Sequence, residues 1–129
     1  MRALMFWFMA FAQSVTNSGV YTKEQALRGE RIYGESCARC HAPNLMGGEG
    51  GSPALAGEEF LSRWTGKSAG DLFEVTRKTM PTDDPAGLSR QQYTDLIAYL
   101  FRANAFPPGE KELPRDLPAL NQIRIEAKK

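Results

Sequence analysis

Apolar side chains recur at helical spacing in several stretches of this 129-residue chain. The clearest stretch covers residues 90–104, where Tyr93, Leu96, Ile97 and Leu100 follow the i, i+3, i+4, i+7 spacing of a helix with one buried face. Residues 23–38, 58–64 and 69–80 show the same period less strictly. No segment alternates convincingly between apolar and polar residues as a strand would. The pattern therefore predicts an all-α fold.

Helix starts are marked by hydroxyl side chains with a polar partner three residues later, which is the arrangement of a capping box. The pairs are Thr22 with Gln25, Ser68 with Asp71, and Ser89 with Gln92. In the first helix, Leu27, Ile32 and Tyr33 are expected on the apolar side, and Gly29 and Gly34 interrupt it. A glycine inside a helix costs about 1 kcal/mol relative to alanine. Gly29 therefore suggests a close approach by another element, with a tolerated helix defect as the alternative.

The segments between the helices are rich in residues that break periodic structure. Glycines and prolines dominate residues 42–57, which fits either a flexible loop or a backbone wrapped closely over a flat group. Residues 82–87 form a turn rich in Asp and Pro. Four prolines prevent residues 107–129 from forming one long helix. We expect these last residues to lie on the domain as an extended tail, with a short helical piece around 118–123.

The first residues have a composition of their own. Arg2 precedes an apolar run over residues 3–12, and this run ends in Ala-Phe-Ala, a small-x-small pattern that precedes signal-peptidase cleavage. The run has about half the length that a bilayer crossing needs. We therefore expect residues 1–12 to be a cleaved secretory signal, followed by a flexible lead-in over residues 13–22. A buried N-terminal helix or an artificial extension is the alternative.

The composition is that of one small soluble domain. Hydrophobic residues make up 42% of the chain and charged residues 24%, both ordinary values for a globular protein. The formal net charge is +1 and falls to near zero without Arg2. It gives no reason to expect a nucleic-acid or anionic-membrane partner. We expect a single domain over residues 23–106, followed by the proline-rich tail, residues 107–129.

Five consecutive residues carry the strongest chemical signal. Cys37 and Cys40 are spaced C-x-x-C and are followed at once by His41, which is the attachment signature of a c-type haem. Two intervening residues let one helical turn present both sulfurs to one edge of a porphyrin, where they can form thioethers with its vinyl groups. His41 then falls beneath the ring and can offer an imidazole nitrogen to the iron. The sequence therefore predicts one covalently bound haem c.

Other readings of these residues are weaker. A structural zinc site needs four Cys or His ligands, and the chain holds two cysteines and one histidine. A thioredoxin-like C-x-x-C needs a βαβ context, whereas the flanking pattern here is helical and rich in glycine. A disulfide across two residues would close a very small loop and would leave His41 unexplained.

A sixth iron ligand can come from a methionine. If the signal is removed, Met46 and Met80 remain. Met46 follows His41 by only five residues, so its loop would have to pass around the porphyrin edge. Met80 ends a helix before Pro81, which fixes a turn. Methionine more often fills gaps in a core, but this placement makes Met80 the better ligand candidate.

Several segments resemble the class I cytochromes c. Residues 29–41 are similar to the N-terminal helix of that family, which carries a glycine, an aromatic residue and then the haem motif. Residues 52–57 look like its Pro-x-Leu-x-Gly loop, residues 80–81 resemble its distal ligand, and residues 95–100 are similar to its C-terminal helix. The resemblance implies a cytochrome c fold of three to five helices around one haem. In that fold the first and last helices cross at Gly29.

The resemblance also implies roles for residues of the pocket. The Pro53 carbonyl would accept a hydrogen bond from Nδ1–H of His41 and orient the imidazole. Leu55 would pack on the haem face. Trp64 would donate its indole N–H to a haem propionate, with ordinary core packing as the alternative.

The chain differs from the mitochondrial type in its near-zero charge and proline-rich tail. In these respects it looks more like small bacterial cytochromes that accept electrons from periplasmic dehydrogenases, quinoproteins among them. We therefore expect a periplasmic electron carrier with a dehydrogenase as donor and a terminal oxidase or another cytochrome as acceptor. Arg77 and Lys78 would lie near the haem edge and meet an acidic partner, or would only form a solvated helix end.

Two rival functions stay open. A haem enzyme, or a sensor of gases or redox state, would need an open sixth position at the iron. The absence of a second histidine argues against peroxidase chemistry, because no distal imidazole base is available. The other rival is a subunit docked permanently in a dehydrogenase complex through Leu117, Leu120 and Ile123 of the tail. Those residues equally fit a tail that folds back onto its own domain.

Overall fold

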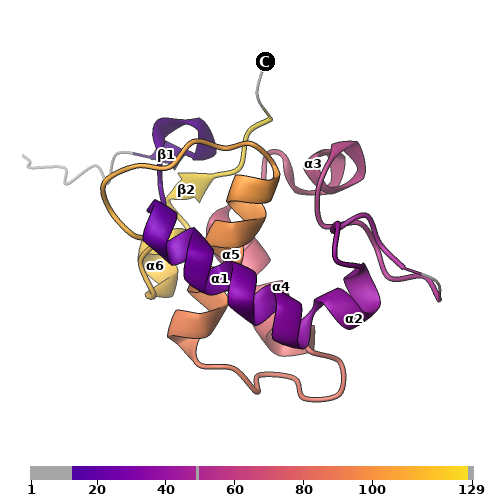
Figure 1. The fold of residues 1–129 in the computed structure, drawn as a ribbon. Coiled ribbons are helices and arrows are strands. Elements are labelled where there is room, and N and C mark those ends of the chain that lie inside the picture. Colours follow the sequence, from indigo (N-terminus) through magenta and orange to yellow (C-terminus); the bar gives the residue numbers. More distant parts are fainter. Residues whose placement is uncertain (1–12, 49, 128–129) are drawn as a thin grey trace, which may run out of the picture.

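The computed structural model describes residues 13–48 and 50–127, which form a mainly helical fold (Figure 1). The elements in chain order are β1 (Ser14–Val15), the 3₁₀ helix η1 (Thr16–Ser18), α1 (Lys23–Ser36), α2 (Ala38–His41), α3 (Glu58–Trp64), α4 (Ala69–Thr79), α5 (Arg90–Ala103), α6 (Leu117–Leu120) and β2 (Ile123–Arg124). The predicted all-α class is confirmed. The described part has six α-helices rather than three to five because α2 and α6 are separate four-residue turns.

The fold is built on the crossing of α1 and α5, which make the most extensive contact between any two described elements. Figure 1 shows α1 running across α5. At the crossing, a Cβ atom on Gly29 would lie only 1.8 Å from the backbone oxygen of Asp95 and 2.8 Å from Cβ of Tyr99. The predicted close approach at Gly29 is therefore confirmed. Beside it, the rings of Tyr33 and Tyr99 pack with centroids 5.3 Å apart.

Two of the three predicted capping boxes form in full. Ser68 with Asp71 and Ser89 with Gln92 each exchange both hydrogen bonds. Thr22 also caps α1, but Gln25 does not return the bond. The Gln25 side chain is buried and turns to the tail, where it accepts a hydrogen bond from N–H of Leu113 at 2.7 Å and donates to its carbonyl at 3.4 Å. A tertiary contact has replaced the expected local one.

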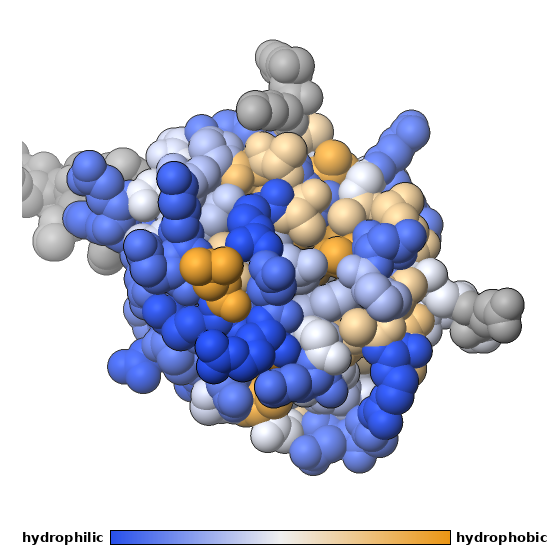
Figure 2. All heavy atoms as spheres, in the orientation of Figure 1, coloured by the Kyte–Doolittle hydropathy of each residue, from blue (hydrophilic) through white to orange (hydrophobic). Residues whose placement is uncertain are grey.

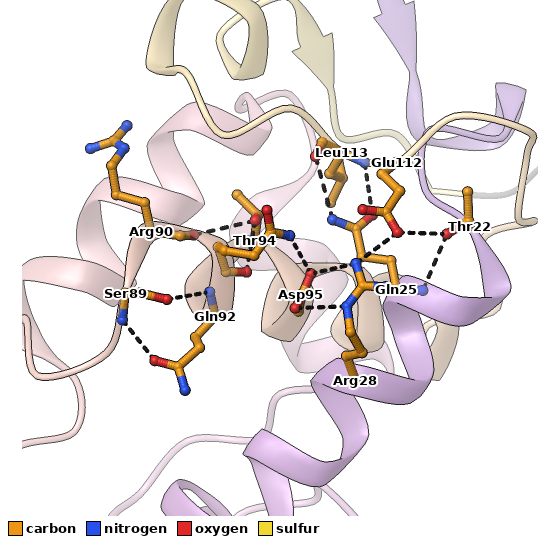
Figure 3. A network of polar contacts seen from close by, with 11 residues as sticks. Thr22, Gln25, Arg28, Ser89, Arg90, Gln92, Thr94, Asp95, Glu112 and Leu113 are labelled. Atoms are coloured by element: carbon orange, nitrogen blue, oxygen red, sulfur yellow. Dashed lines mark hydrogen bonds and ion pairs between the residues drawn. The ribbon is translucent and has the colours of Figure 1, made fainter.

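A charged network fixes the crossing from the outside (Figure 3). Arg28 of α1 donates to both carboxylate oxygens of Asp95 on α5, at 3.1 and 3.2 Å, and to Glu112 of the tail at 2.7 Å. The Asp95 carboxylate is almost fully buried and also accepts a hydrogen bond from Gln91 at 2.7 Å. The hydrogen bonds to Asp95 and then to Glu112 raise the pKa of Arg28.

The core gathers apolar side chains from all the longer helices. The predicted face of α5 is fully buried, with Tyr93, Leu96, Ile97 and Leu100 each at most 3% exposed. The prediction for Leu27 is wrong, because this side chain is 58% exposed. Over α1 the surface is mostly hydrophilic, and hydrophobic residues are more frequent toward α3 (Figure 2). Leu27 thus lies outside the contact with α5.

The lead-in and the tail pack against each other. Strands β1 and β2 pair in parallel, with Ser14 beside Ile123. The Thr16 hydroxyl donates to the Glu126 carbonyl at 3.2 Å and accepts from its N–H at 3.1 Å. The expectation of no strand is therefore wrong for these residues, whereas the flexibility of the lead-in stays a prediction. The two-residue strands are too short to produce an alternating pattern in the sequence.

The predicted secretory signal, residues 1–12, lies outside the described residues, and the limits of the predicted domain stay predictions. Within residues 13–48 and 50–127, every helix falls short of the length and hydrophobicity that crossing a bilayer requires.

Candidate functional site

The C-x-x-C-H segment forms a turn of its own at the end of α1. The first helix ends at Ser36, and Cys37 leaves the helical conformation with φ −127° and ψ −35°. The carbonyl of Cys37 then accepts hydrogen bonds from N–H of Cys40 and of His41, at 3.2 and 3.0 Å. This single turn, α2, brings both sulfurs and the imidazole to the wall of one cavity.

That cavity has a volume of about 500 Å³ and contains every candidate site residue of the sequence analysis. The seven are Cys37, Cys40, His41, Pro53, Leu55, Trp64 and Met80. Its other walls include Leu72, Val75, Leu96 and Leu100 from α4 and α5. Val75 is 50% exposed although it is a large apolar residue, because it faces this cavity. The wall is therefore shaped for a broad apolar group.

His41 is held by the loop that follows it. Its side chain is buried, and Nδ1 lies 2.8 Å from the carbonyl oxygen of Pro53. Since a carbonyl only accepts, Nδ1 carries a proton, and in the neutral imidazole the lone pair is then on Nε2. That tautomer suits an imidazole that binds a metal through Nε2, as a second contact orients such ligands.

The glycine-rich loop wraps closely around the motif. A Cβ atom on Gly48 would lie 2.4 Å from the carbonyl oxygen of Cys40, and N–H of Gly47 donates to the His41 carbonyl at 3.0 Å. Farther along, N–H of Leu55 donates to the Leu45 carbonyl at 2.7 Å. These contacts favour the wrapped backbone over the flexible loop.

Burial changes the chemistry of the first thiol. It raises the pKa of Cys37 to about 11, and the neighbouring Cys40 adds to the shift. The thiol is therefore protonated near neutral pH before any covalent attachment. Reactive C-x-x-C pairs have a depressed thiol pKa instead, and the shift at Cys37 has the opposite direction.

Met80 reaches the cavity from the end of α4. It is the C-terminal capping residue of that helix, and its carbonyl accepts a hydrogen bond from the hydroxyl of Tyr93 at 2.7 Å. Met46 is 58% exposed and does not line the cavity. Of the two methionines considered, only Met80 shares a cavity with His41.

Two residues that support the site were not predicted from the sequence. Asn104 is buried at the end of α5, where its amide donates to the Leu55 carbonyl at 3.1 Å and its oxygen accepts from N–H of Gly57 at 2.9 Å. Tyr93 was assigned to the core alone, yet its hydroxyl holds the Met80 backbone. Asn just after a helix marks only the helix end, so no local signal distinguished these roles.

The cations before Met80 are partly neutralised by their own helix. Lys78 pairs with Glu74 at 3.0 Å, and Nε of Arg77 lies 3.9 Å from the same carboxylate. The pairing with Lys78 lowers the pKa of Glu74. A role of Arg77 and Lys78 in docking stays a prediction.

The residues present fit one haem c. Two thiols lie on one cavity wall, an imidazole with a free Nε2 lies beside them, a thioether sulfur belongs to another wall, and the remaining walls are largely apolar. This donor set matches the covalent and axial contacts of a c-type haem.

Comparison with known proteins agrees with this geometry. A family model described as cytochrome C oxidase, cbb3-type, subunit III matches residues 24–100, which include the C-x-x-C-H motif, the loop, Met80 and most of α5. Searches of curated proteins and of solved structures each found no match to the chain.

Proposed function

The chain belongs to the class I cytochrome c family, and we propose that it is an electron carrier whose haem iron is held between His41 and Met80. Haem-c electron transfer is the function that this family implies. The observation that carries the finer proposal is the single cavity shared by the C-x-x-C-H turn and Met80. When bound, the haem supplies one-electron chemistry because its iron cycles between the ferric and ferrous states.

The residues of the cavity would bind the haem and cover it from solvent. Cys37 and Cys40 would hold the group by thioether bonds, and Pro53 would keep Nε2 of His41 aimed at the iron. Leu55 and Trp64 would cover the ring, and Trp64 would donate to a propionate. The apolar walls of the cavity would keep water away from the iron, which would limit the reorganisation that accompanies electron transfer.

The proposed partners and compartment follow from the sequence. We infer a periplasmic location, because c-type cytochrome domains of this kind are typically extracytoplasmic and residues 1–12 resemble a secretory signal. The donor would be a periplasmic dehydrogenase, such as a quinoprotein. The acceptor would be a terminal oxidase or another cytochrome.

A fixed subunit of an oxidoreductase complex is the second candidate, and the description of the matched family favours it. The tail is a poor docking segment, however, because Leu120 and Ile123 are buried in the core of the chain itself. Gel filtration of the protein without residues 1–12 separates the two: a monomer that exchanges electrons with soluble partners supports the carrier.

Visible spectra of the haem-loaded protein test the His/Met site. The ferric form should show the weak charge-transfer band at the red end of the spectrum that a methionine–iron bond produces, and the ferrous form should not bind carbon monoxide. Met80→Ala should abolish the band and allow rapid carbon monoxide binding. Met46→Ala is the matched control, because it removes the exposed methionine, and it should leave both properties unchanged.

The opposite pattern would reject the proposal. If the unmodified protein lacks the band and binds carbon monoxide rapidly, Met80 is not a ligand and the enzyme or gas-sensor function leads. If Met46→Ala rather than Met80→Ala abolishes the band, the electron carrier stands with a different sixth ligand.

A further inference from the structure

An ion pair joins the two segments that carry the proposed iron ligands. Arg39 lies between Cys37 and Cys40 in the attachment turn, and Asp83 lies three residues after Met80. The guanidinium of Arg39 donates to the Asp83 carboxylate at 3.2 Å, across 44 residues of chain. Both side chains also line the cavity. The pair therefore spans the wall of the site between α2 and the loop after α4.

The loop that follows Met80 has few other attachments. Its hydrogen bonds are short-range: Asp84 N–H donates to the Pro81 carbonyl at 2.9 Å, and Ala86 N–H donates to the Arg77 carbonyl of α4 at the same distance. Among the hydrogen bonds and ion pairs of the described residues, Arg39–Asp83 alone ties residues 81–87 to a segment outside α4. Without it, the hydrogen bonds of residues 81–87 would join the loop only to itself and to α4.

The Met80 segment is held by two contacts that differ in their environment, one buried and one exposed. On the inside, the buried Tyr93 holds the Met80 carbonyl. On the outside, the side chains of Arg39 and Asp83 are 75% and 67% exposed. An exposed pair contributes little to global stability and is screened by salt. It can still bias a local equilibrium in which a surface loop opens while the rest of the fold stays intact.

We propose that Arg39 and Asp83 form a latch that holds the Met80 loop closed over the iron, so that both are positioning residues for the sixth ligand. The latch rests on the proposed ligation by Met80. It also gives the second variable residue of the C-x-x-C motif a function, since Arg39 reaches the opposite ligand segment while its neighbours attach the haem. Opening of the latch would admit outside ligands to the iron.

Imidazole binding to the ferric haem-loaded protein tests the latch, because imidazole can bind only when the Met80 sulfur leaves the iron. At low ionic strength, Asp83→Asn and Arg39→Gln should each raise imidazole affinity roughly two- to fivefold, the range expected for an exposed pair. Asp84→Asn is the matched control. Asp84 is the next residue after Asp83, and its carboxylate makes no ion pair in the described part of the chain. The substitution therefore removes the same charge without removing a pair, and it should have no effect.

Two further measurements separate a latch from general loosening. Added salt should raise imidazole affinity in the parent protein but not in Asp83→Asn, because only the parent has a pair to screen. The combined variant Arg39→Glu with Asp83→Lys should return the affinity toward that of the parent. The midpoint of global unfolding should be the same in all of these proteins.

The latch is overturned if both single variants bind imidazole like the parent, or if Asp84→Asn raises the affinity as much as Asp83→Asn does. In either case an intact methionine–iron band would leave the proposed His/Met site standing. If the parent protein lacks that band, the ligation by Met80 and the latch both fail, so the two failures are distinguishable.

Discussion

Gly29 is the residue at which α1 and α5 come closest. Any side chain there would have to occupy space already taken by the α5 backbone, since the nearest atom is the carbonyl oxygen of Asp95 rather than the end of a flexible side chain. Backbone cannot move aside without separating the two helices. The same helix contains Gly34, and apart from its chain neighbours and the backbone of α1 itself no atom lies within 4 Å of a Cβ at this position. The two glycines therefore differ in what they contribute.

Replacing each glycine by alanine should change stability in opposite directions. Gly29→Ala should lower the free energy of unfolding by about 3 kcal/mol or more, as expected for an overpacked contact. Gly34→Ala should raise it by up to about 1 kcal/mol, because alanine is the better helix former. Urea denaturation of the haem-loaded protein, followed by circular dichroism, measures both. Equal effects of the two substitutions would show that the crossing can relax around a methyl group.

At the scale of single elements, local spacing predicted the helices well. Helices α3, α4 and α5 lie where periodicity and capping residues placed them, because each signal involves residues at most seven positions apart. The break between α1 and α2 at Cys37 was missed, since nothing in the helical period distinguishes a turn that continues from one that restarts. Leu27 was misplaced because α5 covers only part of the apolar stripe on α1.

The candidate site was predictable to the same extent. The C-x-x-C-H motif, Pro53, Leu55, Trp64 and Met80 were found from short motifs and the family resemblance, and they line one cavity. Apart from the crossing at Gly29, which the family resemblance implied, contacts between distant segments could not be inferred. Arg39 with Asp83, Asn104 with the loop, and Gln25 with the tail each join residues 44 to 88 positions apart. Their partners are set by the tertiary fold and leave no periodic signal.

Gln25 joins α1 to the tail, and replacing its side chain should lower the free energy of unfolding. Gln25→Ala leaves the buried N–H and carbonyl of Leu113 without partners, so we expect a loss of about 2–3 kcal/mol in the free energy of unfolding. Gln92→Ala is the control, because its side chain caps α5 at the surface, and it should cost roughly 0.5 kcal/mol. Chemical denaturation compares them. Similar losses would mean that water or a rearranged tail satisfies Leu113.

At the scale of the whole molecule, the lead-in and the tail enclose the side of the helices away from the motif. The β1–β2 pair and the Thr16–Glu126 bonds join the lead-in to the tail, and the Tyr21–Phe106 bond joins the lead-in to the residue just before the tail. The tail adds Leu113, Leu120 and Ile125 to the core. A domain of this size has limited apolar area to bury, so the tail supplies packing that the central helices alone lack.

The Tyr21 hydroxyl offers a way to measure this enclosure through pH. It is buried and donates to the Phe106 carbonyl, and burial raises the pKa of Tyr21. A tyrosine whose pKa is raised in the folded state stabilises the fold, and this contribution to the free energy of unfolding is fully present below the unfolded pKa of about 10. That contribution is lost as the pH rises through the folded pKa, because the unfolded chain releases the proton more easily.

Tyr21→Phe should therefore have two effects on the free energy of unfolding. At neutral pH it should lower this energy by about 1 kcal/mol, the value of a buried hydrogen bond. Above about pH 10 the variant should lose stability less steeply than the parent, since one titrating group is gone. Tyr99→Phe separates the effects, because burial raises the pKa of Tyr99 too, but its hydroxyl makes no hydrogen bond with the described residues. It should flatten the alkaline decline with little loss at neutral pH.

Urea denaturation at a series of pH values measures both slopes. If Tyr21→Phe and the parent decline in parallel, ionisation of Tyr21 does not contribute to the alkaline loss of stability, and this prediction is wrong.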